Sequence, residues 1–227
     1  MARLARVVVP GVPHHVTQRG NRGEKTFFEE ADYRAYRALL AESCGKAGVA
    51  VWAYCLMPNH VHLILVPGHE DGLRQALGEA HRRYTRLVND RQGWRGHLWQ
   101  ERFHSFPMDE PHLLAAARYV ELNPVRARLA KRPQDWKWSS AKAHRAGRDD
   151  GLVTVAPLLE RVGDWKAFLK GGPDEAALAA IRGHERTGRP LGAAAFVERL
   201  ESRLGRALGP RKPGRKPKPK KAVAARK

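Results

Sequence analysis

The chain has 227 residues, 42% of them hydrophobic, and carries 42 Lys and Arg against 23 Asp and Glu, which gives a formal net charge of +19. This excess favours nucleic acid as a partner, because each neutralised phosphate releases counterions and adds affinity; a ribosome-bound or merely solvated basic surface is the alternative. The two cysteines form no Cys-x-x-Cys pair, no apolar run reaches the roughly 18–20 residues of a membrane span, and Pro10 and Pro13 interrupt the apolar stretch that a signal peptide needs. We therefore expect a soluble cytoplasmic protein without a disulfide framework.

Residues 1–130 alternate between strand-like and helix-like patterns. The turn at Pro58 and Asn59 joins two of the expected strands into a hairpin. The order strand, helix, strand, strand, helix, strand, helix predicts an α+β fold, an antiparallel sheet with helices on one face, as in the ferredoxin-like split βαβ motif. The patterns predict strands at residues 12–18, 49–56, 60–66 and 98–108, and helices at 29–46, 73–89 and 111–123.

Residues 131–208 have a looser, helical pattern. Helices are expected at 174–186 and 193–207, joined by the segment TGRPLG at 187–192. Two short helices around a Gly-containing turn are typical of a DNA-binding helix-turn-helix, and equally of a helical hairpin packed on the main domain.

The last segment, residues 209–227, holds nine Lys and Arg and no acidic residue, which leaves +10 of the net charge on residues 1–208. Its prolines and like charges predict a disordered basic tail. Such a tail can place basic side chains against the phosphates of a minor groove, or only keep the protein soluble. The candidate DNA contacts in it are Arg211, Lys212, Arg215 and Lys216.

Two histidines begin the strand expected at residues 60–66. Successive side chains of a strand alternate faces, so His60 and His62 share a face with Ile64 and Val66. Neutral imidazole is a common ligand of divalent transition metals, and the pair therefore offers half of a coordination site. By itself the pattern is more typical of two hydrogen-bonded structural histidines, since a metal site needs a third ligand.

The helix expected at residues 111–123 offers a candidate nucleophile and a third ligand. Tyr119 and Asn123 lie four residues apart, about 40° around the helix axis, and Pro124 should end the helix near them. An amide oxygen can complete a metal site, and a tyrosine one turn earlier can then reach a phosphate. Taken alone, Tyr119 is more typical of an aromatic side chain at the edge of the core.

A metal would make this combination chemically useful. A phenol with a pKa of about 10 is a poor nucleophile at neutral pH, and a metal bound to a non-bridging phosphate oxygen polarises the phosphorus. Attack then gives a covalent phosphotyrosine, and the retained bond energy lets a later hydroxyl rejoin the strand.

Four sequence blocks together resemble the single-tyrosine transposases of the HUH class (His, hydrophobic, His), and most closely their branch associated with repetitive extragenic palindromes (REP). The block MPNHVHLI at 57–64 resembles the HUH signature, and RYVELNPVRA at 118–127 resembles the tyrosine helix. The blocks HVTQRGN at 15–21 and GHLWQERF at 96–103 match two more, in the same order, so that the resemblance covers residues 12–140. No second tyrosine of the relaxase type is evident near Tyr119. The four blocks together favour a catalytic site over purely structural roles for His60, His62 and Tyr119.

The resemblance implies a ferredoxin-like HUH catalytic domain at residues 1–130, a helical extension at 131–208 and the basic tail. It implies cleavage of single-stranded DNA through a 5′-phosphotyrosine, with Tyr119 as the nucleophile, His60, His62 and Asn123 as metal ligands, and Mg²⁺ or Mn²⁺ as the cofactor. The substrate would be an imperfect REP hairpin in bacterial DNA, and the oligomeric state, monomer or homodimer, is left open. Residues 182–215 resemble the C-terminal extension of this branch, which would bind DNA or cover the active site.

Further residues are weaker candidates. Arg19, Arg22 and Arg102 are predicted to contact phosphates or base edges, although generic surface roles are equally typical of a protein this basic. Tyr84 has basic neighbours and is a rival nucleophile, but it has no ligand four residues further on. The remaining histidines considered, His14, His15, His97 and His104, have no partner at a matching spacing.

Other functions remain open at the level of sequence. A replication or mobilisation nickase would use the same chemistry. A non-catalytic regulator would keep the fold as a hairpin-binding module, but it has no need of the His-x-His pair, Tyr119 and Asn123. A zinc-stabilised RNA-binding protein is disfavoured, because the two cysteines lack paired spacing.

Overall fold

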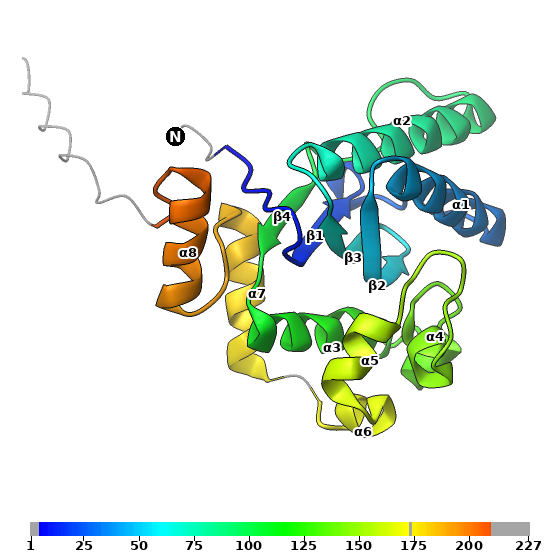
Figure 1. The fold of residues 1–227 in the computed structure, drawn as a ribbon. Helices are drawn as coiled ribbons and strands as arrows, with labels where there is room; N and C mark the ends of the chain where they lie inside the picture. The colour runs from blue at the N-terminus through cyan, green and yellow to red at the C-terminus, as the bar shows by residue number, and fades with distance from the viewer. Residues whose placement is uncertain (1–4, 173, 210–227) are drawn as a thin grey trace, which may run out of the picture.

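The computed structural model describes residues 5–172 and 174–209. Its centre is a four-stranded antiparallel sheet in the order β2-β3-β1-β4 (Figure 1). The strands are β1 (His14–Arg19), β2 (Val49–Met57), β3 (His60–Pro67) and β4 (His104–Pro107). An α+β fold with an antiparallel sheet is thus confirmed.

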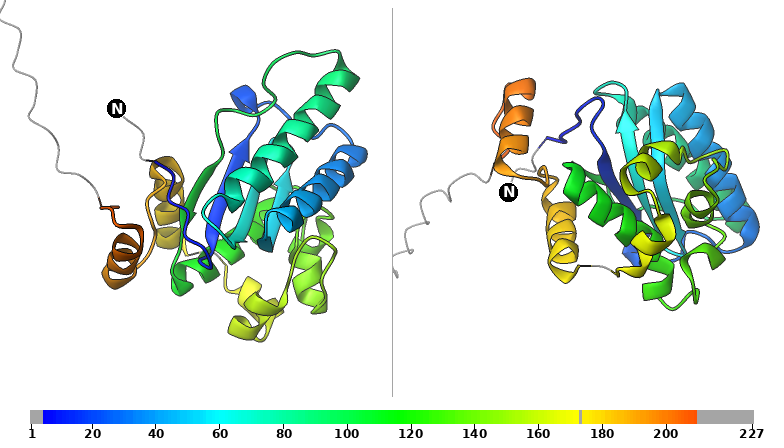
Figure 2. Two further views of the ribbon diagram at one scale, coloured as in Figure 1. Left: turned by 45° about the horizontal axis from the view of Figure 1, so that its top comes forward. Right: turned by 60° about the horizontal axis from the view of Figure 1, so that its bottom comes forward.

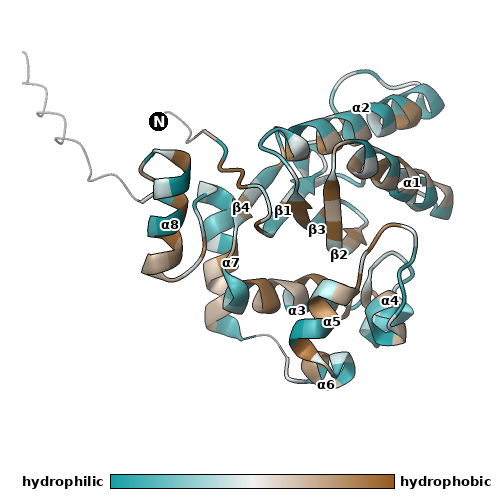
Figure 3. Ribbon diagram, in the orientation of Figure 1, coloured by the Kyte–Doolittle hydropathy of each residue, from teal (hydrophilic) through white to brown (hydrophobic). Residues whose placement is uncertain are grey.

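Helices cover both faces of this sheet, so the expectation of helices on one face was wrong. The side chains of Val61 and Leu63 join the core beneath α1 (Glu30–Lys46) and α2 (Gly72–Gln92). Ile64 and Cys55 point the other way and pack with α3 (Glu110–Arg126) (Figure 2). The physical reason is that β2 and β3 are apolar on both faces, as the hydrophobic colour along β2 in Figure 3 shows, and each face must be buried.

Two further details differ from the sequence-based expectations. The fourth strand is only four residues long, because residues 98–103 form an irregular segment with one isolated bridge, between Gly20 and Trp99. Helix α3 continues past Pro124 to Arg126. Proline removes one backbone donor but has a helical φ of its own, and the N–H of Ala127 still donates to the carbonyl oxygen of Asn123 (2.9 Å).

The C-terminal helices wrap around α3 and the edge of the sheet. Trp165 of α6 and Ile181 of α7 belong to the core cluster of α3, whereas Phe196 of α8 packs against Val7 and Val9 near the N-terminus. The expected pair of helices is present, and its role as a helix-turn-helix stays a prediction. The helices after α3 are α4 (Ala141–Ala146), α5 (Ala156–Val162), α6 (Trp165–Lys170), α7 (Glu175–Thr187) and α8 (Ala194–Leu204); two 3-10 turns lie at Asn21–Gly23 and Pro133–Asp135.

A buried carboxylate fixes α3 against this extension. Glu121 is fully buried and accepts hydrogen bonds from Ser140 (2.6 Å), from Nδ1 of His144 (2.6 Å) and from the indole of Trp165 (2.7 Å). Since Glu121 lies two residues from both Tyr119 and Asn123, these bonds also fix the rotation of the helix that carries them.

None of the helices in residues 5–172 and 174–209 combines the length and the apolar character that spanning a membrane requires.

Candidate active site

His60 and His62 lie side by side on the face of the sheet that α3 covers. The register places His60 opposite Arg19 of β1, and His62 opposite Thr17 of β1 and Cys55 of β2. The two imidazole centroids are 4.9 Å apart. The alternation expected from the sequence therefore describes the actual positions of both rings.

Neighbouring side chains orient both rings through the same nitrogen. Nδ1 of His60 is 2.6 Å from Oδ1 of Asn59, and Nδ1 of His62 is 3.3 Å from Nε2 of His15. This leaves Nε2 of each ring for another partner. A hydrogen bond at one ring nitrogen fixes which nitrogen can bind a metal, so the pair is preorganised as ligands.

Burial keeps these imidazoles neutral. It lowers the pKa of His60 to about 4, with a smaller contribution from the positive charge of Arg19. Burial also lowers the pKa of His62 well below its usual range, and the nearby His60, His15, Arg19 and Arg126 add to this effect. At pH 7 both rings are therefore unprotonated, the form in which histidine binds a metal.

Helix α3 brings Tyr119 and Asn123 over these histidines. The helix begins at a cap where the side chain of Asp109 accepts from the backbone N–H of His112 (3.2 Å). The Tyr119 ring centroid is 5.1 Å from that of His62, and the exposed fractions of Tyr119 and Asn123 are 6% and 8%. Residues that are 57 or more positions apart in the sequence thus meet at one place.

These residues line a cavity of about 650 Å³ with a strongly basic wall. Four arginines contribute to it against one carboxylate, Glu185. The guanidinium of Arg126 lies 5.1 Å from the ring centroid of Tyr119. Such a wall suits a phosphodiester backbone, since guanidinium groups bind phosphate oxygens with fixed geometry. The lining residues are Thr17, Gln18, Arg19, His60, His62, Gln100, His104, Tyr119, Asn123, Arg126, Ala127, Arg182, Glu185 and Arg186.

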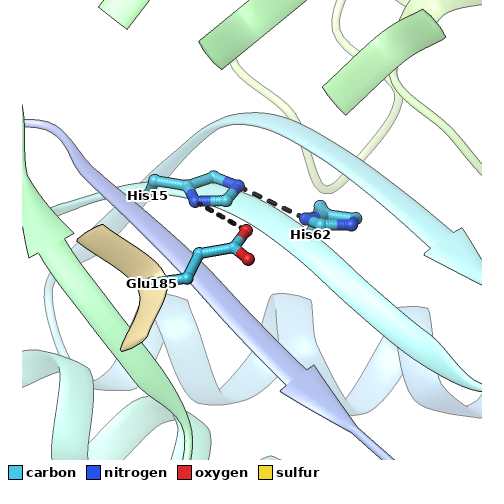
Figure 4. A group of neighbouring side chains, drawn as sticks. All are labelled: His15, His62 and Glu185. Atoms are coloured by element: carbon cyan, nitrogen blue, oxygen red, sulfur yellow. Dashed lines mark hydrogen bonds and ion pairs between the residues drawn. The ribbon is translucent and has the colours of Figure 1, made fainter. Parts of the chain in front are cut away.

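His15 and Glu185 also belong to the site, although sequence reasoning had set His15 aside and had not considered Glu185. Figure 4 shows His15 between His62 and Glu185, with Nδ1 of His15 at 3.6 Å from Oε1 of Glu185. Their ligand atoms and one of His62 lie within 4.8 Å of one another, so they could also hold a cation. Burial lowers the pKa of His15 to about 3 and raises that of Glu185 to about 7. The detectable signal for His15 was only its place in a motif block.

The donor set fits a divalent cation. Two neutral imidazoles and an amide oxygen or a carboxylate are ligands that Mn²⁺ accepts, and the oxygen donors also suit Mg²⁺. His60, His62 and Asn123 line the cavity, whereas His15 does not. We therefore treat His15 as a residue that positions His62 and not as a ligand itself.

A substitution of His15 should weaken metal binding. We expect His15→Phe, which keeps a ring but removes the contact to Nδ1 of His62, to lower Mn²⁺ affinity by about 10- to 100-fold in titration calorimetry. His14→Phe is the matched control, because His14 contacts Val9 and Val12 and not the active-site histidines. Equal affinities of the two variants would contradict the positioning role.

Of the other residues predicted to contact DNA or to act as nucleophile, only one lines the active-site cavity among those that the structure describes. Arg19 lines the active-site cavity, whereas Arg102 lines two smaller neighbouring cavities. Arg22 is outside the residues that line the active-site cavity and adopts a left-handed backbone conformation, φ 55°. Tyr84 is fully buried on the opposite side of the sheet, where its hydroxyl donates to the carbonyl oxygen of Thr26 (2.7 Å), a place that argues against it as the nucleophile. Arg211, Lys212, Arg215 and Lys216 lie outside the described residues.

Known proteins with similar sequences match the part of the chain that forms the sheet. A model of the IS200-like transposases matches residues 10–123, just over half of the chain, and the chain belongs to this transposase family. The resemblance drawn from the motifs is thereby confirmed.

Two similar proteins come from the REP-associated branch. The chain is 25% identical over 116 residues to a Haemophilus influenzae protein provisionally named a REP-associated tyrosine transposase, a match covering 46% of this chain and 66% of that protein, slightly less than two thirds. The fold is similar to the solved structure of a REP-associated tyrosine transposase bound to a REP hairpin, with a TM-score of 0.53 and 20% identity, over 68% of this chain and 92% of the other.

Proposed function

We propose that the protein cleaves and rejoins single-stranded, hairpin-containing DNA through a 5′-phosphotyrosine on Tyr119. The observation that carries this proposal is the meeting of Tyr119 and Asn123 with His60 and His62 in one basic cavity. The membership of the chain in a transposase family supports the same reaction class.

The proposed step balances in atoms and charge. The Tyr119 oxygen forms a bond to phosphorus, and the bond from phosphorus to the 3′ oxygen of the preceding nucleotide breaks. The phenol loses one proton and the leaving 3′ oxygen gains one, so the products are a 5′-phosphotyrosine and a free 3′ hydroxyl. The reverse attack by a 3′ hydroxyl joins strands without an added energy source.

The surrounding residues would each have a role in this step. His60, His62 and Asn123 would hold Mg²⁺ or Mn²⁺, which supplies electrophilic activation of the phosphate when bound. Arg126, beside the Tyr119 ring, and Arg19, beside His60, would bind the phosphate oxygens and offset the charge that develops on them.

We further propose that the substrate is a REP-like hairpin with single-stranded flanks and that residues 1–130 are the catalytic unit. The support is the similarity to a REP-associated transposase whose solved structure contains a REP hairpin. We also propose that the helical extension, residues 131–208, limits access to the active-site cavity. The support is that Arg182, Glu185 and Arg186 of α7 line this cavity.

The test is a cleavage assay on a pool of single-stranded DNA hairpins with Mg²⁺ or Mn²⁺, and in parallel with EDTA. We expect a covalent protein–DNA adduct on a denaturing gel with either metal and none with EDTA. Adducts that form equally in EDTA would contradict the metal-dependent mechanism. Tight hairpin binding without an adduct under any metal would favour a non-catalytic hairpin-binding regulator.

A further inference from the structure

A second cavity, of about 420 Å³, lies beside α2, away from Tyr119. Helix α2 contributes Gly78 and His81 to its walls, and the irregular segment at residues 98–103 contributes Trp99 and Phe103. We call it the Trp99 cavity. We propose that it binds one unpaired nucleobase of the DNA strand that reaches Tyr119, an inference that rests on the function proposed above.

The first argument is a buried donor without a partner. Trp99 is 7% exposed, and its ring centroid lies 4.7 Å from that of His81. Its indole N–H is buried and finds no acceptor among the described residues. Buried donors in native proteins are nearly always satisfied, by protein, water or ligand, so this N–H of a lining residue is a donor that a bound acceptor can satisfy. Every nucleobase carries acceptors on its edge.

The second argument is the division of the cavity into aromatic and basic parts. Its walls are mainly apolar, with the rings of Trp99, Phe103 and His81, and its volume is within the range of ligand-binding pockets. Four arginines and one carboxylate, that of Glu101, are also among the lining residues. Aromatic surfaces with neighbouring basic groups are the usual means of binding single-stranded nucleic acid, since bases stack on the rings and phosphates meet the charges. The four are Arg6, Arg74, Arg82 and Arg102.

Arg6 and Arg102 both line this cavity and a smaller one beside β4, and the charge of Arg102 acts on Arg6. The guanidinium of Arg6 lies 3.5 Å from the ring centroid of Phe103 and donates to the carbonyl oxygen of Phe103 (2.9 Å). Burial, and then the charge of Arg102, lower the pKa of Arg6 to about 10. A phosphate placed between the two guanidinium groups would relieve this repulsion and hold the strand at the cavity.

The third argument is continuity with the candidate active site. A smaller cavity of about 170 Å³ at the edge strand β4 shares His104 and Arg186 with the active-site cavity. It shares Arg6, Arg102 and Phe103 with the Trp99 cavity, and Gln18 lines both larger cavities. A single strand that lies at Tyr119 can therefore follow one basic depression across β4 and turn a base into the Trp99 cavity.

Gly78 allows this inference to be tested without disturbing the core. It is an exposed helical position, and a Cβ added there meets no other atom within 4 Å. In Gly78→Leu the new side chain therefore occupies open space at the cavity wall, and leucine favours the helix over glycine. Gly45→Leu is the matched control, because Gly45 is an exposed, equally open glycine of α1 that lies outside the Trp99 cavity.

The experiment measures binding by fluorescence anisotropy in EDTA, with a DNA hairpin that carries single-stranded oligo-dT flanks. A series of probes has one abasic site at each flank position. We expect one abasic position to weaken wild-type binding by roughly 5- to 100-fold, the range for loss of one stacked base. Gly78→Leu should weaken binding of the intact probe to a similar degree and should lose nothing further with the abasic probe. Trp99→Phe, which keeps a ring but lacks the N–H, should show part of this loss.

Three outcomes would overturn the inference. The first is that Gly78→Leu and Gly45→Leu bind all probes alike, and the second is that the abasic penalty persists in full in Gly78→Leu. If either outcome is found while the wild-type protein still forms adducts, the proposed function stands and only the role of the Trp99 cavity is wrong. The third is a wild-type protein that binds no hairpin probe and forms no adduct, in which case both fall.

Discussion

We expect Tyr119→Phe to form no covalent DNA adduct at the metal concentrations where the wild-type protein is expected to react. The substitution removes one oxygen from a side chain that is 6% exposed and keeps the ring that packs beside His62 and Arg126. Since phenylalanine offers no nucleophile, we expect the rate of strand cleavage to fall on the order of 10⁴-fold or more. The measurement is the amount of labelled DNA that stays attached to protein on a denaturing gel.

Tyr84→Phe is the matched control for this experiment. It also removes a tyrosine hydroxyl from a buried ring, but from one beneath α2, where the hydroxyl donates to Thr26. We expect this variant to form adducts as the wild type does, with hairpin affinity unchanged in both variants. Adducts that persist in Tyr119→Phe and disappear in Tyr84→Phe would reverse the assignment of the nucleophile.

Glu121→Ala should strongly destabilise the protein. It leaves three buried donors, on Ser140, His144 and Trp165, without their shared acceptor, and it opens space in the core. Breaking a buried polar network of this kind costs about 3–5 kcal/mol, a large part of the stability of a domain. The measurement is the free energy of unfolding in urea.

Two further variants make the Glu121 result specific. Glu121→Gln keeps one acceptor oxygen and should cost about 1–3 kcal/mol. Glu110→Ala, at an exposed glutamate in the first turn of the same helix, should change the free energy of unfolding by only about 0.5 kcal/mol. Equal effects of Glu121→Ala and Glu110→Ala would show that the network does not stabilise α3.

The parts of the site that the sequence predicted are those set by local geometry. His60 and His62 share a face because strand side chains alternate, and Tyr119 and Asn123 share a side of α3 because they are one turn apart. His15 and Glu185 could not be placed in this way. His15 reaches His62 only through the register that pairs it with Ile64, and Glu185 arrives on α7 after a long helical connection.

In the fold, too, local features could be predicted from the sequence, whereas features that depend on distant contacts could not. Most element positions follow from periodicity, but the number of covered sheet faces depends on how distant helices pack. Val61 and Leu63 on one face of β3 and Ile64 on the other are all apolar, a pattern typical of a sheet buried on both sides, although helices were expected on one face only. The strand β4 is short because residues 98–103 are irregular. The apolar residues in that segment had led us to expect a strand over the whole of residues 98–108.

The anchoring of Glu121 also bears on how this protein can be shortened or recombined. The region matched by the transposase family ends at residue 123, whereas all three donors to Glu121 come from residues 140–165. Asp109 at the start of α3 and Pro107 of β4 likewise hydrogen-bond the backbone of Leu191. The matched region therefore depends on the C-terminal residues for the partners of Glu121, Asp109 and Pro107. A fragment cut at its boundary would leave the carboxylate of Glu121 without its three donors on an uncovered apolar face of α3. A chimaera should therefore take α3 and the helices that follow it from the same parent.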